Sequence, residues 1–316
     1  HGSNKSDYGY GITTDSTDSI YITGNTAGDL DGQTNNGETD IFVSKFNSDG
    51  IKQWTKLFGS NQTDYANDLT TDSAGSIYIT GSTNGDFHGE INNSNSYIHS
   101  NHNDGFIIKL DSDGKEKWTT LYGSSGDEYV YGITTDQDGA IYIGGLTTKD
   151  LDGQTNNGDT DTFVSKFNSD GVKQWTKLHG SNKSDYGYGI TTDSDNLIYI
   201  IGYTQGDLDG ATNSGQEDAF ISKLVPIHSP IDISLSDIDF NENIIAGTIV
   251  SNLLTTDLDI SDTHTYSLSS GMGDIDNESF SIDDDQLKIN ISPDYETQSS
   301  YNIRLKTTDS DGLSYE

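Results

Sequence analysis

Short runs of β-branched and aromatic residues recur along the chain, and each run is too short for a helix. The first four are YGITT (10–14), SIYITG (19–24), DIFVSKF (40–46) and IKQWTKL (51–57). Residues of this kind favour strands. The segments between them are DSTDS, a long loop rich in Gly, Asn and Asp, and NSDG, all of which are composed of turn-forming residues. The pattern therefore predicts four antiparallel strands in this stretch.

The same four runs return along the chain with a long period. A Gly-Ser pair follows His1, Phe58, Tyr122 and His179, and each of these four residues marks the start of a unit. Successive units are therefore 57, 64 and 57 residues long. The first sixteen residues, HGSNKSDYGYGITTDS, recur unchanged at 179–194. Four antiparallel strands in each unit predict one propeller blade per unit. Helical repeats would instead need amphipathic stripes with the period of a helix, and the units have none.

We therefore expect an all-β fold in which antiparallel four-stranded blades form a partial or small propeller. The fourth blade is incomplete, because Trp-bearing fourth strands close only three units. The expected blades are residues 1–57, 58–121, 122–178 and 179–225.

The repeated motif resembles a known family. The pattern D-x-F-V-S-K-x-x-x-x-G-x-x-x-W-x-x-x-x-G-S, followed by D-Y and G-I-x-x-D-x-x-x-x-I-Y-I-x-G, is similar to the bacterial SBBP β-propeller repeat over residues 1–225. The resemblance implies a propeller of about seven blades and no single activity. We therefore expect neighbouring repeats in a larger parent chain, upstream of residue 1. Closure with four blades is the alternative.

A different pattern begins near residue 226. The segment VPIHSP contains two of the three prolines, the long period stops there, and residues 226–230 are expected to form a linker. Six short alternating runs follow, and such a series predicts a β-sandwich. The runs are DISLSDIDF, GTIVSNLL, HTYSLSSG, SFSID, QLKINI and YNIRLKTTD.

Residues 231–316 resemble a bacterial cadherin-like repeat. The motifs that carry the resemblance are NENIIAGTIVSNLLTTDLD, TYSLSSG, DNESFSID and PDYETQSSYNIRLKTTDSDGLS. The resemblance implies a cadherin- or Ig-like β-sandwich, here truncated at its C-terminal end, and calcium ligands wherever the motifs match. Calcium bound between carboxylates would stiffen such a module. The implied ligands are Glu242, Asp257, Asp259, Asp294, Glu296 and Asp309.

Composition narrows the possible partners. The chain has 16 basic and 51 acidic residues, for a formal net charge of −35. Such a charge argues against nucleic acid and anionic membranes as partners, and surplus carboxylates suit calcium. The absence of Cys excludes disulfides and thiol catalysis. No apolar run approaches the length of a membrane span, so we expect no membrane insertion in this segment.

Three acidic loops form a second group of candidate calcium sites. They are DLDGQTNNGETD (29–40), DLDGQTNNGDTD (150–161) and DLDGATNSGQED (207–218). Carboxylates between flexible glycines can gather around calcium, and the alternative is that Asp, Asn and Gly simply form loops well. The up-and-down topology places these loops and the GSNKSD junction at the same end of the blades. The candidate ligands are Asp29, Asp31, Glu38, Asp40, Asp150, Asp152, Asp159, Asp161, Asp207, Asp209 and Asp218.

Some of these acids have another possible role. Asp40, Asp104, Asp161 and Asp218 stand directly before the third strand of each unit, and the alternative is that they make contacts between blades.

The second unit has an insertion that its neighbours lack. Its long loop, residues 86–105, is seven residues longer and contains His88, His99 and His102 near Asp104. These imidazoles could bind a transition metal, and an ordinary polar insertion is the alternative.

The aromatic residues suggest two roles. The three Trp occupy one equivalent strand position, so we expect them to pack between blades, although aromatic faces also bind sugars. No P-loop, HExxH motif or nucleophile elbow is present, and we expect no enzymatic activity.

Together these features predict a secreted or surface-attached bacterial protein with a scaffold or adhesion function. The propeller would be the interaction platform for a cell-surface protein or glycan, and the cadherin-like module a calcium-stiffened stalk. One alternative is a carbohydrate-binding or carbohydrate-active propeller that uses the long-loop face. Another is a spacer without a ligand.

Overall fold

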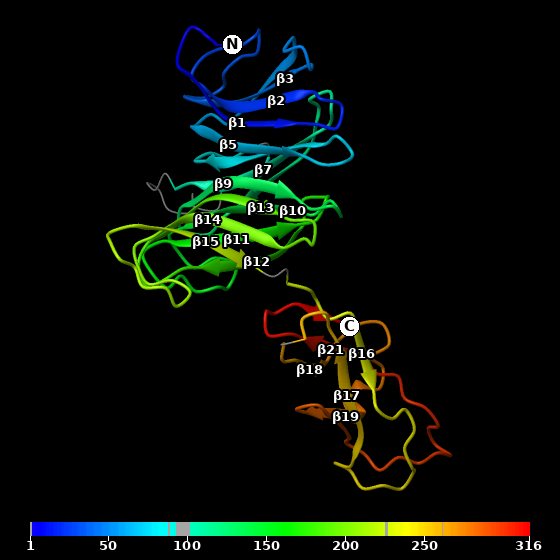
Figure 1. Ribbon diagram of the computed structural model, residues 1–316. Coiled ribbons are helices and arrows are strands. Elements are labelled where there is room, and N and C mark those ends of the chain that lie inside the picture. The colour runs from blue at the N-terminus through cyan, green and yellow to red at the C-terminus, as the bar shows by residue number, and fades with distance from the viewer. Residues whose placement is uncertain (1, 88, 93–101, 225–226, 261) are drawn as a thin grey trace. The chain divides into compact units, whose positions relative to one another are not determined.

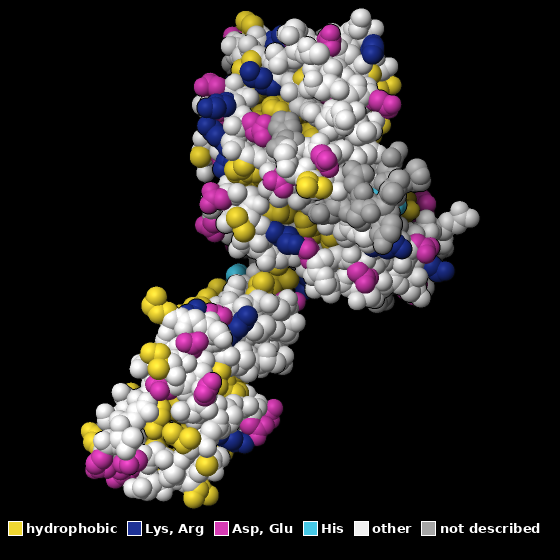
Figure 2. All heavy atoms as spheres, turned by 180° about the vertical axis from the view of Figure 1, so that it is seen from behind, with side chains coloured by type: hydrophobic (Ala, Val, Ile, Leu, Met, Phe, Trp, Pro, Cys, Tyr) yellow, Lys and Arg dark blue, Asp and Glu magenta, His cyan; other side chains and the backbone are white. Residues whose placement is uncertain are grey.

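The computed structural model describes residues 2–87, 89–92, 102–224, 227–260 and 262–316. The chain divides into two compact units, residues 1–226 and 227–316 (Figure 1). Nearly all regular structure is strand, as the sequence predicts. Among the described residues, no helix has the length and apolar character needed to span a membrane. Acidic side chains are scattered over the visible face of both units, with Lys and Arg among them (Figure 2).

The first unit consists of four successive antiparallel sheets, here called blades 1 to 4. Each sheet pairs its strands in chain order, and blade 4 has three strands among the described residues. Blade 1 consists of β1 (Asp7–Thr14), β2 (Ile20–Thr26), β3 (Asp40–Phe46) and β4 (Lys52–Phe58), and blade 2 consists of β5 (Asp64–Thr71), β6 (Ile77–Thr83), β7 (Asp104–Leu110) and β8 (Glu116–Tyr122). Blade 3 consists of β9 (Glu128–Thr135), β10 (Ile141–Thr147), β11 (Asp161–Phe167) and β12 (Lys173–His179). Blade 4 consists of β13 (Asp185–Thr192), β14 (Ile198–Thr204) and β15 (Asp218–Leu224).

One short motif closes the first hairpin of every blade. In blade 1, Asp15 Oδ1 accepts hydrogen bonds from the N–H groups of Thr17 and Ser19 at 2.8 and 3.0 Å. Its Oδ2 accepts one from the hydroxyl of Tyr21 at 2.9 Å. An Asp side chain that bonds nearby backbone N–H groups favours a tight turn. The same Asp–Tyr bond recurs at Asp72–Tyr78, Asp136–Tyr142 and Asp193–Tyr199.

A bulge in the first strand of each blade requires glycine on the second strand. The pairing of β5 with β6 shifts register between Ala66 and Asp68. At this point the backbones approach so closely that a Cβ on Gly81 would overlap the carbonyl oxygen of Tyr65. Gly24, Gly145 and Gly202 stand at the equivalent positions and meet the equivalent carbonyls. Glycine has no side chain and tolerates this approach.

The blades bury apolar surface by packing against one another. The second and third strands of one blade lie against the first strand of the next, as β2 and β3 do against β5. Val43 on β3 and Leu69 on β5 belong to one buried cluster. Trp54 packs near Tyr21, with ring centroids 6.2 Å apart. Trp118 packs in the same way near Tyr78 in blade 2, and Trp175 packs near Tyr142 in blade 3. Each of these pairs lies within one blade. Trp54 also lies against Gly114 in the last hairpin of blade 2, and Trp118 lies against Gly171 in that of blade 3, so these two Trp residues pack between blades as the sequence predicts.

The second unit contains two small antiparallel sheets. One has the order β16 (Asp232–Leu235), β17 (Ile249–Thr256), β20 (Gln286–Ile289) and β19 (Phe280–Asp283). The other has the order β18 (Thr265–Leu268), β21 (Leu305–Thr308) and β22 (Ser314–Tyr315), and a 3₁₀ turn, η2 (Asn277–Ser279), precedes β19. A cluster around Val250, Phe280, Leu287 and Ile289 forms the core. All six predicted runs contain a strand, and β22 is an additional one.

We predict that Gly81→Ala destabilises the first unit by about 3 kcal/mol, because the new Cβ would force the β5 and β6 backbones apart. Urea unfolding followed by Trp fluorescence measures this change, since Trp54, Trp118 and Trp175 all lie in the first unit. Gly9→Ala is the matched control. Nothing lies within 4 Å of its notional Cβ, so its unfolding should match that of the wild type. Equal stability of Gly81→Ala and Gly9→Ala would contradict this account of the bulge.

Candidate metal centres

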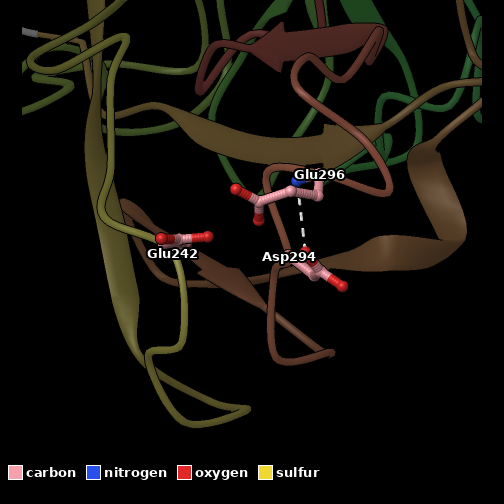
Figure 3. Close-up of side chains that lie close together, drawn as sticks. All are labelled: Glu242, Asp294 and Glu296. Carbon is pink, nitrogen blue, oxygen red and sulfur yellow. Dashed lines mark hydrogen bonds between the residues drawn. The ribbon is translucent and has the colours of Figure 1, made fainter.

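Three exposed carboxylates converge in the second unit, and we call them the exposed cluster. Glu242 lies in the loop after β16, whereas Asp294 and Glu296 lie in the loop after β20 (Figure 3). One oxygen from each lies within 4.8 Å of the others. The Glu296 N–H donates to Asp294 Oδ1 at 3.2 Å, drawn as a dashed line in Figure 3, and the Tyr295 N–H donates to Glu242 Oε2 at 3.2 Å. The second of these bonds joins two loops that are distant in sequence.

Asp294 is held in its charged form. A hydrogen bond from the Thr297 hydroxyl, at 2.8 Å, lowers the pKa of Asp294, and the N–H of Glu296 contributes to the decrease. Asp294 therefore presents an ionised oxygen ligand, the kind that calcium prefers.

A second group, the buried cluster, consists of Asp257, Asp262 and Asp309. Their carboxylate oxygens also lie within 4.8 Å of one another. Asp257 follows β17, Asp309 follows β21, and Asp309 is only 6% exposed. Asp309 Oδ1 accepts the N–H groups of Asp311 and Leu313 at 3.0 and 2.8 Å.

The buried cluster has oxygens without hydrogen-bond donors. Oδ2 of Asp309 and Oδ2 of Asp262 are both buried, and neither has a partner among the described residues. Burial raises the pKa of Asp309, and the negative charge of Asp262 adds to the rise. Buried carboxylate oxygens without partners are unfavourable unless a cation or proton compensates them.

The residues of both clusters fit a hard cation. Calcium takes six to eight oxygen ligands from carboxylates, carbonyls and water, and each cluster supplies three carboxylates. In the buried cluster, His264 Nε2 lies 2.9 Å from Asp257 Oδ2 and orients that carboxylate. No sulfur or imidazole ligand belongs to either cluster, a composition that argues against zinc.

Five of the six ligands implied by the cadherin-like resemblance belong to these two clusters. Glu242, Asp294 and Glu296 form the exposed cluster, and Asp257 and Asp309 belong to the buried cluster. The exception is Asp259, which accepts the His228 N–H at 2.6 Å and lies 2.9 Å from His228 Nδ1. Asp262 occupies the third place in the buried cluster, and our sequence analysis missed it. The available signal was a third Asp in the segment DLDISD.

The acidic loops of the blades use their carboxylates differently. Asp31 pairs with Lys52 at 2.5 Å, and the Thr55 hydroxyl donates to it at 2.6 Å. Asp29 accepts the N–H of Asn35 within its own loop, and Asp150 and Asp207 do the same in theirs. In the described structure, loops 29–40, 150–161 and 207–218 contribute no group of three acids close enough to share an ion. This geometry favours the loop-forming alternative there.

The other candidate calcium ligands in these loops also belong to no group of three neighbouring acids among the described residues. Asp152 pairs with Lys173 and accepts the Thr176 hydroxyl, and Asp209 accepts the Ser222 hydroxyl at 3.0 Å. Glu38 and Asp159 are exposed, and Asp218 accepts the N–H of Ser214. Calcium binding by these residues remains a prediction.

Of the acids before the third strands, Asp40 and Asp161 lie between blades, as the alternative interpretation expects, whereas Asp218 is only partly buried. Asp40 is fully buried and neighbours Asp64, the first residue of the next blade's β5, which is also fully buried. Asp40 Oδ2 accepts the Asn36 N–H at 2.8 Å, and the Asp64 N–H donates to the Thr39 carbonyl at 2.9 Å. We call such couples seam pairs. Asp161 and Asp185 form the corresponding pair between blades 3 and 4.

Burial and like charge act together in the seam pairs. Burial raises the pKa of Asp161, and the negative charge of Asp185 adds to the rise. Each of the two carboxylates has a buried Oδ1 without a partner in the described residues. The Asp161 carboxylate therefore binds a proton more readily than an exposed Asp does.

The histidine-rich insertion is only partly covered by the structure. His88 and His99 lie outside the described residues. His102 Nδ1 lies 3.1 Å from Asp127 Oδ2, and Asp104 is fully buried at the start of β7. Binding of a transition metal there remains a prediction.

Comparison with known proteins identifies the repeats. Four segments match the family model described as "Beta-propeller repeat", SBBP, namely residues 2–31, 53–88, 117–152 and 174–209. The chain thus contains four SBBP repeats, which confirms this part of the resemblance.

The curated relatives are much longer than this chain. The regulatory protein FlaEY of Caulobacter vibrioides is 27% identical over 168 residues, which are 50% of this chain and 17% of that protein. An uncharacterized WD repeat-containing protein of Acanthamoeba polyphaga mimivirus is 27% identical over 199 residues, 54% of this chain and 14% of that protein. The match therefore spans less than a fifth of either relative.

Solved structures show weak similarity. A protein of unknown function from Dyadobacter fermentans is 10% identical with a TM-score of 0.43, and the match covers 67% of this chain and 59% of that one. A catalytically inactive virginiamycin B lyase from Staphylococcus aureus, solved with quinupristin, is 19% identical with a TM-score of 0.38, and the match covers 69% and 57%.

We predict that Asp161→Asn stabilises the first unit at neutral pH by about 1 kcal/mol, because it removes one of two buried like charges and keeps an acceptor for the Asn157 N–H. The raised pKa of Asp161 determines how its effect on stability changes with pH. The stabilising contribution of Asp161 is complete below pH 3.8, which is the ordinary pKa of Asp. This contribution is lost as the pH rises through the raised pKa of Asp161 in the folded state. The advantage of the variant should therefore disappear in acid.

Urea unfolding at neutral pH and below pH 3.8, followed by Trp fluorescence, measures this difference. Asp159→Asn, which changes an exposed acid in the same loop, is the control and should have little effect at either pH. A loss of stability in Asp161→Asn at neutral pH would contradict the prediction and indicate that the seam pair needs both charges.

Proposed function

We propose that this chain, with its four SBBP β-propeller repeats, is a non-catalytic interaction scaffold of the bacterial cell surface or exterior. In this proposal the blades form the binding platform for a surface protein or glycan, with a role in adhesion. The second unit is a cadherin-like module that calcium stiffens. The observation that carries the proposal is the buried cluster, in which the orphaned Asp309 oxygen faces two further carboxylates.

The position of the clusters supports a stiffening role for calcium. The exposed cluster joins the loop after β16 to the loop after β20, and the buried cluster joins the ends of β17 and β21. A cation shared by such distant segments cross-links them in the folded state only. Ligands that bind only the folded state raise its stability.

The blades support a binding role more than a catalytic one. Blades 1, 3 and 4 have similar sequences, so similar surfaces recur from blade to blade. An active site requires an asymmetric arrangement of groups, whereas repeated surfaces suit binding. The strong negative charge favours a partner that is neutral or basic.

Carbohydrate binding by the blades is a second candidate function. Tyrosines of the first strands of blades 3 and 4 and of the second strand of blade 4 are partly exposed and lie near one another. The ring centroids of Tyr131 and Tyr188 are 5.1 Å apart, and those of Tyr188 and Tyr203 are 5.9 Å apart. Exposed aromatic rings can stack on sugars. Glycan-array binding that disappears in Tyr188→Ala would favour this function over the protein-binding scaffold.

We predict that calcium stabilises the second unit and that Asp309→Asn weakens calcium binding by about tenfold or more, because the site loses one carboxylate charge. Calorimetry of the full chain, with calcium and with chelator, should show a midpoint increase in one transition only. Trp fluorescence should not follow that transition, because all three Trp lie in the first unit.

The matched control is Asp259→Asn, which removes a neighbouring acid that pairs with His228 and lies outside the clusters. It should keep the calcium response. A wild-type protein that melts identically in calcium and chelator would refute the calcium-binding module.

A further inference from the structure

The first strand of every blade begins with an acid and a tyrosine. Tyr65 of blade 2 is 44% exposed, although blade 2 packs against blade 1 and against blade 3. Ser82 lies directly opposite on β6 and therefore on the same face of the sheet, yet it is 1% exposed and accepts the Val130 N–H of blade 3 at 3.3 Å. Blade 3 thus covers the second strand and leaves the Tyr65 ring in contact with solvent. Further blades at either end of the array would leave this junction as it is.

Tyr129 is the neighbour of Tyr65 across the junction between blades 2 and 3. The first strands β5 and β9 lie against each other. Burial raises the pKa of Tyr129, and the charges of Asp127 and Tyr65 add to the rise, so both groups lie near the Tyr129 phenol. The Tyr129 ring is partly exposed and stacks on Tyr131, with ring centroids 6.4 Å apart. The junction therefore presents several tyrosine rings close together.

A hydrogen-bonded network holds the Tyr129 ring in place. The side-chain amide of Asn103 donates to the Tyr129 hydroxyl oxygen at 2.8 Å. Asp127 Oδ1 accepts the backbone N–H of Asn103 at 2.9 Å, and His102 Nδ1 lies 3.1 Å from Asp127 Oδ2. The Tyr129 oxygen accepts the bond from Asn103, so its own proton remains available for donation. An aromatic ring fixed in this way binds a ligand without first being ordered.

The junction between blades 2 and 3 differs from the other two junctions. Asn103 lies in the loop that is seven residues longer than its equivalents, and Asp127 lies in the segment that joins the two blades. At the other junctions the equivalent residues carry hydroxyl groups and form short parallel bridges, Thr39 with Thr63 and Thr160 with Ser184. The polar groups beside Tyr129 therefore belong to one junction and are not required by the stacking of the blades.

The side chains at this junction favour a neutral glycan as the ligand. Tyrosine rings pack against the apolar faces of sugar rings. Asp127 accepts hydrogen bonds and the Tyr129 hydroxyl donates them, and sugar hydroxyls can do both. A proline-rich peptide also packs on aromatic rings, but proline has no N–H group to donate to Asp127. The net charge of −35 disfavours an acidic glycan.

We propose that the junction between blades 2 and 3 binds a neutral glycan. In this proposal sugar rings pack on Tyr65 and Tyr129, and sugar hydroxyls bond to Asp127 and to the Tyr129 hydroxyl. The inference rests on the carbohydrate-binding function named above and assigns that function to one junction. The network through Asn103 sets the orientation of the Tyr129 ring.

Affinity electrophoresis of the full chain tests the proposal in native gels that contain dextran, mannan or galactan. The wild type should migrate more slowly in at least one of these gels than in a gel without polysaccharide. Tyr65→Ala and Tyr129→Ala should each weaken binding about tenfold, because each removes one packing surface for a sugar ring. Tyr10→Ala is the matched control, because it removes a tyrosine of β1 that is 58% exposed and lies outside this junction. It should bind as the wild type does.

Tyr129→Phe separates packing from hydrogen bonding. This variant keeps the aromatic ring and loses the hydroxyl, so its affinity should lie between those of the wild type and Tyr129→Ala. Equal affinities of Tyr129→Phe and Tyr129→Ala would contradict packing on the ring. Trp fluorescence of each variant during urea unfolding verifies that the blades remain folded.

The outcomes distinguish failure of the site from failure of the function. A wild type that no polysaccharide retards, whether or not it binds polyproline, refutes both carbohydrate binding and this site. Binding that persists in Tyr65→Ala and Tyr129→Ala but disappears in Tyr188→Ala keeps the function and refutes the site. Equal losses in Tyr10→Ala and Tyr65→Ala show that binding is not confined to this junction and overturn the assignment.

Discussion

The first unit depends on one constraint, which is that each blade has two different apolar faces and can bury them only against its neighbours. The second and third strands carry one face, with Val43, Ile107 and Val164 as fully buried examples. The first strand carries the other, with Leu69 and Ile133. Stability in such an array arises mainly from contacts between adjacent repeats. This explains why the repeats keep apolar residues at these positions.

Stacking the blades also buries charge at their junctions. The parallel contact between Thr39 and Thr63 brings Asp40 against Asp64, and neither side chain reaches solvent. Backbone N–H groups compensate part of this charge, as Asn36 does for Asp40 and Ser60 does for Asp64. Asp40 and Asp161, two of the residues that we considered as loop calcium ligands, thus lie at the contacts between blades. Acidity at these positions follows from how the blades join.

The strands could be predicted because hydrophobic alternation is a local property, and β3 has the bounds that the sequence indicates. The first strand begins at Asp7, before the predicted run, because Gly9 and Gly11 flank a bulge that interrupts the pattern. The role of Asp40 could not be decided, since its burial depends on the following blade. The absence of Asp259 from the clusters likewise depends on His228, a partner that spacing alone does not reveal.

The two kinds of buried carboxylate in this chain require different compensation. In a seam pair, Asp161 and Asp185 each accept a hydrogen bond from a backbone N–H group, which compensates part of the repulsion between them. In the buried cluster three carboxylates converge, so one proton leaves two charges, and the oxygens of Asp262 and Asp309 still lack donors among the described residues. A divalent cation balances that charge and binds several oxygens at once. The same residue type therefore lies buried at the contacts between blades in one unit and suits ion binding in the other.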